Sequence, residues 1–355
     1  METYIKMKNL AIYIHIPFCK SKCAYCNFFS LVSEKKINDY VNSLKREIVS
    51  RKDYLGGEKV KTIYFGGGTP SLLPTKYIDE ILKILNNNFD LVSNPEITLE
   101  ANPDTIDKEQ LFDLKSLGVN RISIGIQSFH DDDLKYLDRR HDSKHALQII
   151  DDLKCVGFEK LTLDLIYGIP TLTEEKWNKN LDIFFSTGIS HLSAYALTVE
   201  PKTILGHRIE KGDLQDVNEE ETVRHYEILV DRTKENGFEH YEISNFAKAG
   251  FEGRHNLKYW QYYDYIGFGV SAHSFVDGIR YSNSRDIKAY VNGLDIRDSF
   301  ERIDIRAAEN EYVMLGMRLS DGIDTTLFEK RFGESFDSKF GPALSPFVKS
   351  GHVIF

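Results

Sequence analysis

Short alternating apolar runs and longer amphipathic segments follow one another through the first two-thirds of the chain. Alternation of apolar and polar residues predicts strands over residues 11–16, 61–65, 96–100, 121–126, 161–166 and 191–197. Helical spacing of apolar residues predicts helices over residues 34–52, 75–89, 108–117 and 174–186, with further helices ending near residue 156. Six such units with right-handed crossovers predict an α/β fold. Its parallel sheet either curls into a partial (βα)6 TIM-like barrel or stays flat and doubly wound.

The pattern changes after Pro201, where strands and helices no longer alternate. Residues 219–236 predict a long amphipathic helix, and an aromatic, glycine-rich tract follows over residues 240–281. We therefore expect three parts: a barrel core over residues 1–200, an extension that completes the barrel over residues 201–300, and a C-terminal module over residues 301–355.

The last part of the chain predicts a smaller, mainly helical module. A polar linker is expected over residues 295–301, and a first helix over residues 309–319 follows the start of the module at Ile305. Residues 345–355 resemble the beginning of another helix and strand. Because the chain stops there without a polar cap, we expect this module to be truncated.

Three of the four cysteines gather directly after the first predicted strand. Cys19, Cys23 and Cys26 have the spacing C-x3-C-x2-C, which is typical of a soft-metal site. A structural zinc ion or a simple iron–sulfur electron carrier uses four protein ligands. The fourth cysteine, Cys155, falls far away in a predicted helix, where a small core residue is expected. The pattern therefore predicts a [4Fe–4S] cluster with one iron open to a ligand that is not protein.

Composition argues against nucleic-acid-binding, membrane-spanning and secreted proteins. The net charge is −9, from 54 acidic and 45 basic residues, which argues against broad electrostatic binding to nucleic acid or to an anionic membrane. No apolar run reaches the length of a membrane span, and residues 1–10 lack the apolar centre of a signal peptide. Cysteines clustered three to one do not resemble a disulfide framework, so we expect a cytoplasmic protein.

Polar residues fall at the carboxyl end of each predicted strand after the first. They are the turn 66–71, Glu100, Asn102, Gln127, Ser128, Asp164, Tyr195 and Thr198. In a parallel barrel these ends share one rim, where ligands bind. Structural explanations stay open beside this one: the glycines as a tight turn, Glu100 as a helix cap, and Gln127 and Asp164 as buried groups bonded to backbone. Arg139 lies in a charged helix end, where a solvated side chain is the default.

These residues carry a resemblance that covers nearly the whole chain. The cysteine spacing, with an aromatic residue before the last cysteine, resembles the signature of the radical S-adenosylmethionine (SAM) superfamily. The wider segments are similar to the branch of that superfamily with the HemN-type coproporphyrinogen III oxidases and the HemW-type haem chaperones. Those segments are Tyr13–Phe18, Phe65–Ser71, Leu99–Pro103, Ile124–Phe129 and Leu163–Pro170.

The resemblance implies a cofactor site and a chemistry. The open iron would bind SAM, and one electron from the reduced cluster would cleave it to methionine and a deoxyadenosyl radical. Gly67, Gly68 and Thr69 would hold the amino end of SAM, and Arg139 would pair with its carboxylate. The remaining implied contacts, to other polar groups of SAM or to the pocket wall, are Glu100, Gln127, Asp164, Tyr13 and Tyr25.

Three features of the resemblance favour the chaperone branch over the oxidases. The oxidases typically extend the motif to a fourth cysteine, where this chain has Phe28, and they carry a sizeable segment before the cluster motif. The chain also has an H-N-x-x-Y-W motif, at His255, Asn256, Tyr259 and Trp260, which resembles one associated with the chaperones. A histidine beside aromatic side chains predicts haem binding, although a hydrogen-bonded histidine in an aromatic core explains the motif too.

The function expected from the resemblance is a radical SAM haem chaperone with a [4Fe–4S] cluster, SAM and haem as cargo. The implied partners are haem-accepting respiratory proteins and an electron donor for the cluster, with no nucleic acid. Homodimer formation, peripheral membrane contact and productive cleavage of SAM stay open. The alternatives are an oxygen-independent coproporphyrinogen III oxidase and, less favoured by the three-cysteine count, an electron carrier.

Overall fold

The computed structural model of the chain describes residues 10–294 and 296–354, and a parallel sheet lies at its centre. Six strands lie side by side in chain order: β1 (Leu10–Ile16), β2 (Val60–Gly67), β3 (Leu91–Ala101), β4 (Arg121–Gln127), β5 (Lys160–Tyr167) and β6 (His191–Ala196). Each strand pairs in parallel with the next one, as Ile12 with Ile63 and Leu163 with Leu192 show. The six predicted strands are confirmed.

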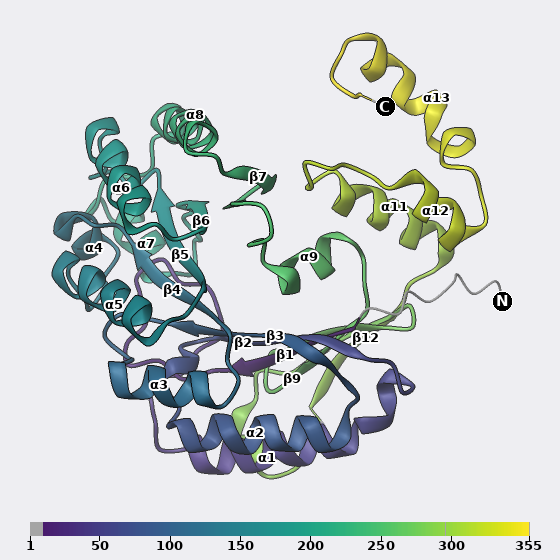
Figure 1. Cartoon of the computed structure of the whole chain (residues 1–355), viewed down its shortest axis with the longest axis horizontal. Helices are drawn as coiled ribbons and strands as arrows, with labels where there is room; N and C mark the ends of the chain where they lie inside the picture. The colour runs from purple at the N-terminus through teal and green to yellow at the C-terminus, as the bar shows by residue number, and fades with distance from the viewer. Residues whose placement is uncertain (1–9, 295, 355) are drawn as a thin grey trace.

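Helices cross between consecutive strands on the outside of this sheet (Figure 1). They are α1 (Ile37–Ser50), α2 (Thr75–Asn88), α3 (Lys108–Ser116), α4 (Asp131–Tyr136), α5 (Ser143–Val156) and α6 (Glu174–Thr187), with short 3-10 helices η1 (Lys52–Leu55) and η2 (Pro70–Leu72). Because the strand order is consecutive, right-handed crossovers leave every helix on the same face and the sheet curls. The partial barrel is therefore confirmed, and the doubly wound alternative, which covers both faces, is excluded.

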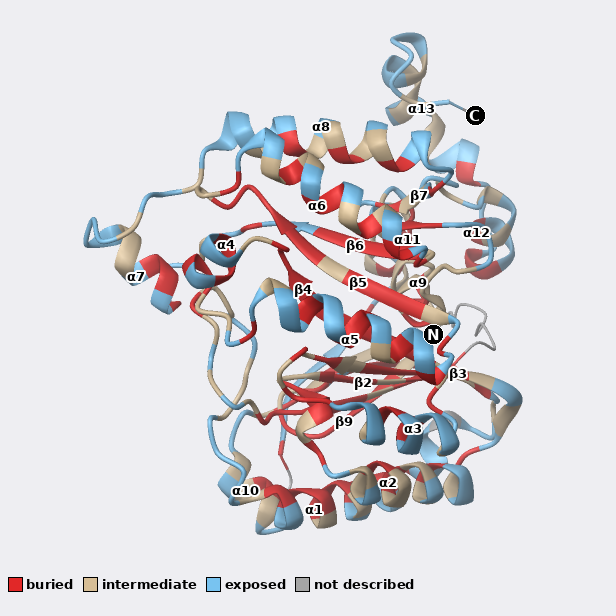
Figure 2. Ribbon diagram, turned by 60° about the vertical axis from the view of Figure 1, so that its left-hand side comes forward, coloured by how far each residue is buried: buried red, intermediate tan, exposed pale blue. Residues whose placement is uncertain are grey.

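Local sequence signals fix where these helices begin and end. Asp107, Asp142 and Thr173 accept hydrogen bonds from the first turns of α3, α5 and α6, which satisfies amide groups that have no partner within the helix. Gly157 and Gly188 end α5 and α6 in the left-handed conformation. The helices bury one face against the sheet and expose the other, as the red strands and blue outer faces in Figure 2 show.

The segment after residue 200 extends both edges of the sheet. It holds α7 (Ile204–Glu210), α8 (Glu219–Glu235), β7 (Glu239–Glu242), β8 (Asn245–Ala247), α9 (Arg254–Trp260), β9 (Tyr265–Phe268), β10 (His273–Val276), β11 (Ile279–Asn283), α10 (Ile287–Val291) and β12 (Arg297–Arg302). β9 pairs in parallel with β1, and β8 pairs antiparallel with β6. Within the described residues, one sheet of 12 strands results, in the order β12-β11-β10-β9-β1-β2-β3-β4-β5-β6-β8-β7.

The expected polar linker over residues 295–301 is wrong for its described part, because most of it forms the edge strand β12. All of its residues are exposed, and among the described strands β12 pairs only with β11, where Tyr281 lies opposite Phe300. A solvent-exposed edge strand needs no buried apolar residues, so its sequence resembles a linker. Residue 295 lies outside the described residues.

The C-terminal module is helical, with α11 (Ile305–Gly316), α12 (Thr325–Phe332) and α13 (Phe336–Lys349). Its apolar side chains form a second core with Tyr262 and Phe275 from the preceding segment. The helix expected to start at Ser345 is wrong, since α13 begins at Phe336, and residues 350–354 form no strand. Residue 355 lies outside the described residues. None of the described helices is long and apolar enough to cross a membrane.

Candidate cofactor and ligand site

A cavity of about 490 Å³ lies at the carboxyl ends of the barrel strands and beneath the loop that carries the cysteines. We call it the cysteine pocket. Most of the predicted site residues line it: Cys19, Cys23, Tyr25, Cys26, Gly67, Gly68, Thr69, Glu100, Gln127, Arg139, Asp164, His255 and Asn256. The rim predicted from the strand ends is thus assembled around one cavity. Its volume falls in the range of small-molecule sites.

The cysteine loop is closed by its own backbone. The Cys19 amide donates to the carbonyl of Leu31 at 3.0 Å, and the Cys26 amide donates to the carbonyl of Cys23 at 3.1 Å. Thr69 Oγ1 lies 3.5 Å from Cys19 Sγ, and Arg139 Nη1 lies 3.4 Å from Cys23 Sγ. Burial raises the pKa of the Cys19 and Cys26 thiols, so their thiolates need a positive partner in this pocket.

The donor set fits a cluster better than a single ion. Among the residues that the structure describes, no three His, Cys, Asp or Glu side chains are placed to hold one metal ion. The thiolates of a [4Fe–4S] cluster bind different irons, so they need to face one cavity and not one point. Cys19, Cys23 and Cys26 do so. The buried Arg139 Nε, which has no hydrogen-bond partner in the described chain, places positive charge beside them.

Glycines at the end of β2 and directly after it allow the turn 66–69 to pack against the cysteine loop. Gly67 has φ +116°, and a Cβ there would lie 2.5 Å from the His15 ring. A Cβ on Gly68 would lie 2.8 Å from the carbonyl oxygen of Phe18. The amides of Gly67, Gly68 and Thr69 already donate within the protein, to Glu100, Ile16 and Phe18 respectively. A ligand amino group donates hydrogen bonds, so it would meet carbonyl oxygens of this turn and not its amides.

A bulge turns the side chain of Gln127 into the pocket. Gln127 has φ +69°, a conformation that side chains other than glycine rarely adopt, and the β4–β5 register shifts between Gly125 and Gln127. Gly125 leaves room for the Gln127 amide, since a Cβ would lie 2.8 Å from Gln127 Nε2. Such strain is typical of functional positions.

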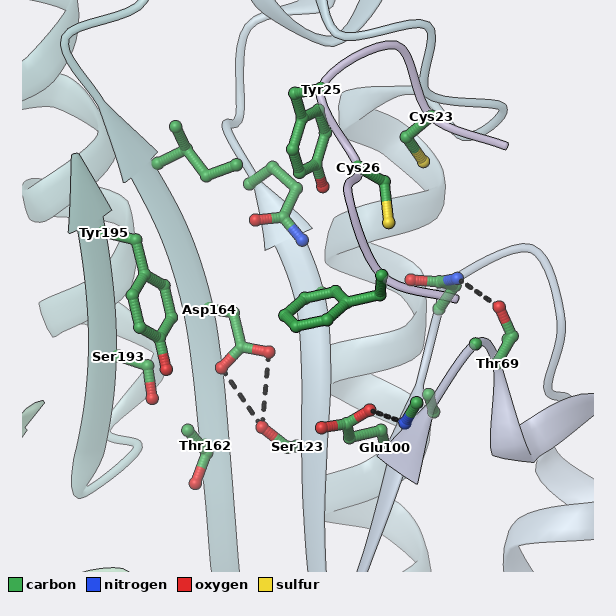
Figure 3. Close-up of a pocket in the computed structure, with 18 of the residues that line it drawn as sticks. Cys23, Tyr25, Cys26, Thr69, Glu100, Ser123, Thr162, Asp164, Ser193 and Tyr195 are labelled. Carbon is green, nitrogen blue, oxygen red and sulfur yellow. Dashed lines mark hydrogen bonds between the residues drawn. The ribbon is translucent and has the colours of Figure 1, made fainter. Parts of the chain in front are cut away.

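Two half-buried carboxyl groups form the acidic part of the pocket (Figure 3). Glu100 accepts hydrogen bonds from Tyr64 Oη at 2.8 Å and from the Gly67 amide at 3.1 Å. Ser123 Oγ donates to Asp164 at 3.1 Å. Burial raises the pKa of Glu100, and burial followed by the charge of Glu100 raises the pKa of Asp164 to about 7. The pair is prepared for a cationic ligand, which would favour both ionised forms.

Helix α9, which carries the H-N-x-x-Y-W motif, lies on the inner side of the curved sheet (Figure 1). The His255 amide donates to Glu96 at 3.1 Å, and the ring nitrogens lie 2.9 Å from Thr62 Oγ1 and 2.9 Å from Tyr259 Oη. Burial lowers the pKa of His255 to about 3. The ring is 2% exposed, and neither nitrogen is free for iron in this arrangement.

A second cavity, of about 700 Å³, adjoins the cysteine pocket and lies beside the last turn of α9. We call it the aromatic pocket. Its walls come from β1, the end of the cysteine loop, the segment 259–285 and α11, and its aromatic lining consists of Tyr13, Phe28, Phe29, Tyr259, Trp260, Tyr262, Tyr263, Tyr265 and Phe275. The motif is thus divided, because His255 and Asn256 line the cysteine pocket whereas Tyr259 and Trp260 line the aromatic one.

Tyr13 lies in the aromatic pocket and is not part of the cysteine pocket, contrary to its expected place beside SAM. Tyr64 of the neighbouring strand stacks on it, with ring centroids 6.2 Å apart, and lines the cysteine pocket instead. The expected place of Tyr13 came from the resemblance to the radical SAM superfamily. The side chain it meets across the sheet decides which cavity it enters.

Several pocket residues were missed in the sequence. They are Tyr64, Thr98, Arg121, Ser123, Thr162, His191 and Ser193. Many stand two residues before a predicted site residue, as Thr98 before Glu100 and Thr162 before Asp164 do. The two-residue period of a strand puts such pairs on one face, so this signal could have found them.

The chain was compared with known proteins. Residues 13–183 match the radical SAM superfamily model, and residues 304–355 match the HemN C-terminal domain. The heme chaperone HemW of Bacillus subtilis is 35% identical over 96% of this chain and 92% of its own length. The chain belongs to the HemW family. The HemW family member of Escherichia coli is 37% identical over 81% of this chain and 77% of its own length.

A solved structure extends the comparison to the fold. The coproporphyrinogen III oxidase HemN of Escherichia coli, described as a radical SAM enzyme, aligns with a TM-score of 0.84 at 23% identity. The alignment covers 97% of this chain and 84% of that one, and at this identity it shows the shared fold alone. As a member of the radical SAM superfamily, the chain has a [4Fe–4S] cluster and SAM as cofactors, which agrees with the three facing thiols.

Proposed function

We propose that the chain is a haem chaperone that holds a [4Fe–4S] cluster and SAM in the cysteine pocket, binds haem and passes it to acceptor proteins. The observation that carries the proposal is the similarity, over nearly the whole length, to relatives named heme chaperone HemW. The HemN oxidase shares the fold at 23% identity only. Phe28, where the oxidases typically have a further cysteine, also supports the chaperone.

Within the cysteine pocket we assign Cys19, Cys23 and Cys26 to three irons of the cluster, which leaves one iron for SAM. Arg139 stands beside Cys23 and would pair with the SAM carboxylate. The cofactors supply reductive cleavage of the SAM carbon–sulfur bond, and the protein supplies binding and orientation. Thr69 and Arg139, which lie beside the thiols, are suited to binding and orienting SAM.

The remaining predicted contacts have distinct roles in this proposal. Carbonyl oxygens of Gly67, Gly68 and Thr69 would accept from the SAM amino group, which is a donor. Glu100, Gln127 and Asp164 would take its other polar groups, and the Tyr25 ring would form the wall beside the cluster.

Partners and place in the cell follow from the same chemistry. Three free thiols that must stay reduced indicate the cytoplasm. The cluster needs an electron donor, and we infer that haem-accepting respiratory proteins receive the cargo. Haem transfer is to be measured for the monomer and for a homodimer. It is also to be measured with and without a membrane surface.

The test uses one anaerobically reconstituted sample for two assays. The proposal predicts haem uptake and transfer to an acceptor, with no decarboxylation of coproporphyrinogen III. Sustained turnover of coproporphyrinogen III would contradict it and favour the oxidase. A Cys155→Ala variant is the matched control. Cys155 is exposed, so the expected core position is wrong, and its thiol lies outside both pockets, so the variant should leave both results unchanged.

A further inference from the structure

The aromatic pocket contains two histidines that differ in their hydrogen bonds. His15 is buried, with Nδ1 at 3.1 Å from Tyr13 Oη and Nε2 at 3.1 Å from the Phe29 carbonyl. His273, the first residue of β10, is exposed, and no hydrogen bond or ion pair joins its ring to any other described residue. Only His273 of this pair therefore offers a free nitrogen to a ligand in the cavity.

Cationic side chains lie beside His273. Arg280 is already held by Glu311 at 2.6 Å and by Glu301 at 3.3 Å, so its charge is largely compensated. Arg285 lines the same pocket and forms no ion pair within the described chain. Burial, and then the charges of Arg285 and Arg280, lower the pKa of His273, which favours the neutral imidazole that binds metal.

The rest of the cavity suits a large, flat, mostly apolar ligand. Aromatic rings form most of its lining, and Met314 of α11 supplies a thioether from the C-terminal module. Phe28 and Met314 are 71% and 60% exposed, which is uncommon for large apolar side chains and leaves the pocket open at its edge. An open pocket allows a cargo to leave again without unfolding of the wall.

We propose that haem binds in the aromatic pocket, with its iron ligated by His273, its rings against the aromatic wall and a propionate paired with Arg285. This inference rests on the proposed function, and it moves the haem ligand from His255 to a histidine that lines the aromatic pocket. His255 then has a positioning role, in which it fixes Tyr259 and the wall between the pockets. A free imidazole, an unpaired guanidinium and an apolar cavity match the three chemical parts of haem.

The test is a titration of haem into cluster-loaded protein under anaerobic conditions, followed by absorption and resonance Raman spectra. His273→Ala is expected to lower haem affinity by about tenfold or more, with loss of the iron–imidazole signal. His273→Met should retain binding but change the spectrum of the ligated iron. Arg285→Glu should weaken binding severalfold without a change of axial ligand.

The controls separate this inference from the proposed function. His145→Ala removes an exposed histidine from α5, far along the chain from the pocket, and should change nothing. If the unsubstituted protein takes up no haem, the proposed function itself fails. If it takes up haem, and His273→Ala and His273→Met both bind it with unchanged affinity and spectrum, the proposed function stands and the assignment of His273 is overturned.

Discussion

The two pockets differ in how the chain builds them. The cysteine pocket is assembled from successive strand ends and one loop, so its residues follow a regular order along the sequence. The aromatic pocket combines β1, residues of the 259–285 segment and a helix of the C-terminal module. The first contains the thiols and the carboxyl groups of Glu100 and Asp164, whereas aromatic rings form most of the lining of the second. The difference shows that one short motif can line two cavities, since the H-N-x-x-Y-W motif of α9 contributes side chains to both pockets.

The largest expected effect comes from removing one thiolate, which should change the cysteine pocket and leave the aromatic pocket unchanged. Cys23→Ala should abolish cluster assembly, because two cysteines cannot hold three irons. Haem affinity should stay within about twofold of the unsubstituted protein, since Cys23 does not line the aromatic pocket. Iron and sulfide content measures the first result and haem titration the second. Parallel loss of both would mean that the two cavities are not independent.

A second substitution tests the wall that divides the pockets. Arg121 pairs with Glu96 at 3.3 Å, with both side chains buried, and donates to the carbonyls of Phe251 and Glu252 before α9. Arg121→Met should lower the free energy of unfolding by about 3 kcal/mol, because a carboxylate is left buried without its closest cation. Urea denaturation measures the change.

The control for that substitution is a surface ion pair. Lys83→Met breaks the exposed pair of Lys83 with Asp79, 2.6 Å apart on α2, and should change stability by less than about 1 kcal/mol. Equal effects of Lys83→Met and Arg121→Met would show that the buried pair has no special place in the wall.

A third prediction concerns pH and only the cysteine pocket. Because the folded protein raises the pKa of Asp164 to about 7, it binds the proton more tightly than the unfolded chain, and stability falls as the pH rises from about 4 to 7. Asp164→Asn should remove this loss, so the variant should be more stable than the unsubstituted protein at pH 8 and similar at pH 4. Thermal unfolding at both pH values tests this, and a variant less stable at pH 8 would contradict it.

The same carboxylate should govern SAM affinity. SAM carries a net positive charge, so its binding to the unsubstituted protein should strengthen as the pH rises through 7 and Asp164 ionises. Asp164→Asn should bind SAM about tenfold more weakly at pH 8 and show a flatter pH profile. Haem affinity should not follow this profile, since Asp164 lies outside the aromatic pocket.

The smallest expected effect is at Phe28, which lines both pockets. Its ring is 71% exposed, so Phe28→Ala should alter the free energy of unfolding by less than about 0.5 kcal/mol. SAM and haem affinities should each fall about twofold, because one shared wall becomes shorter. A loss confined to haem would place Phe28 in the aromatic pocket alone.

Sequence patterns predicted the strands and the polar residues of the rim, because parallel strands bring their carboxyl ends to one edge. They left open whether the sheet curls into a barrel or stays flat, and the assignment of the rim residues to SAM came from the resemblance. They did not predict that the His255 nitrogens meet Thr62 and Tyr259, since Thr62 lies on a strand far from α9 in the sequence. Tyr13 was misplaced for the related reason that its neighbour across the sheet, Tyr64, occupies the cysteine pocket. β12 resembled a linker because edge strands can be wholly exposed.

The aromatic pocket could not be predicted for a further reason. Met314 and Glu311 join Tyr13 and His273 only through packing of the C-terminal module, for which no local period exists. Contacts between distant segments depend on the whole fold, whereas strand ends depend on a repeat. The cysteine pocket was therefore predictable, because it is built from repeated strand ends. The aromatic pocket was not predictable, because it is built from segments with no repeat.

The most direct test of the account is whether haem and SAM occupy the protein independently. SAM affinity is measured by equilibrium dialysis with labelled SAM on cluster-loaded protein, first without haem and then with haem bound. Separate pockets beside the first and last turns of α9 predict a SAM dissociation constant that changes by less than about twofold, with both ligands bound at once. Displacement of SAM by haem, in proportion to the haem added, would contradict the account, because it would place both ligands in one cavity.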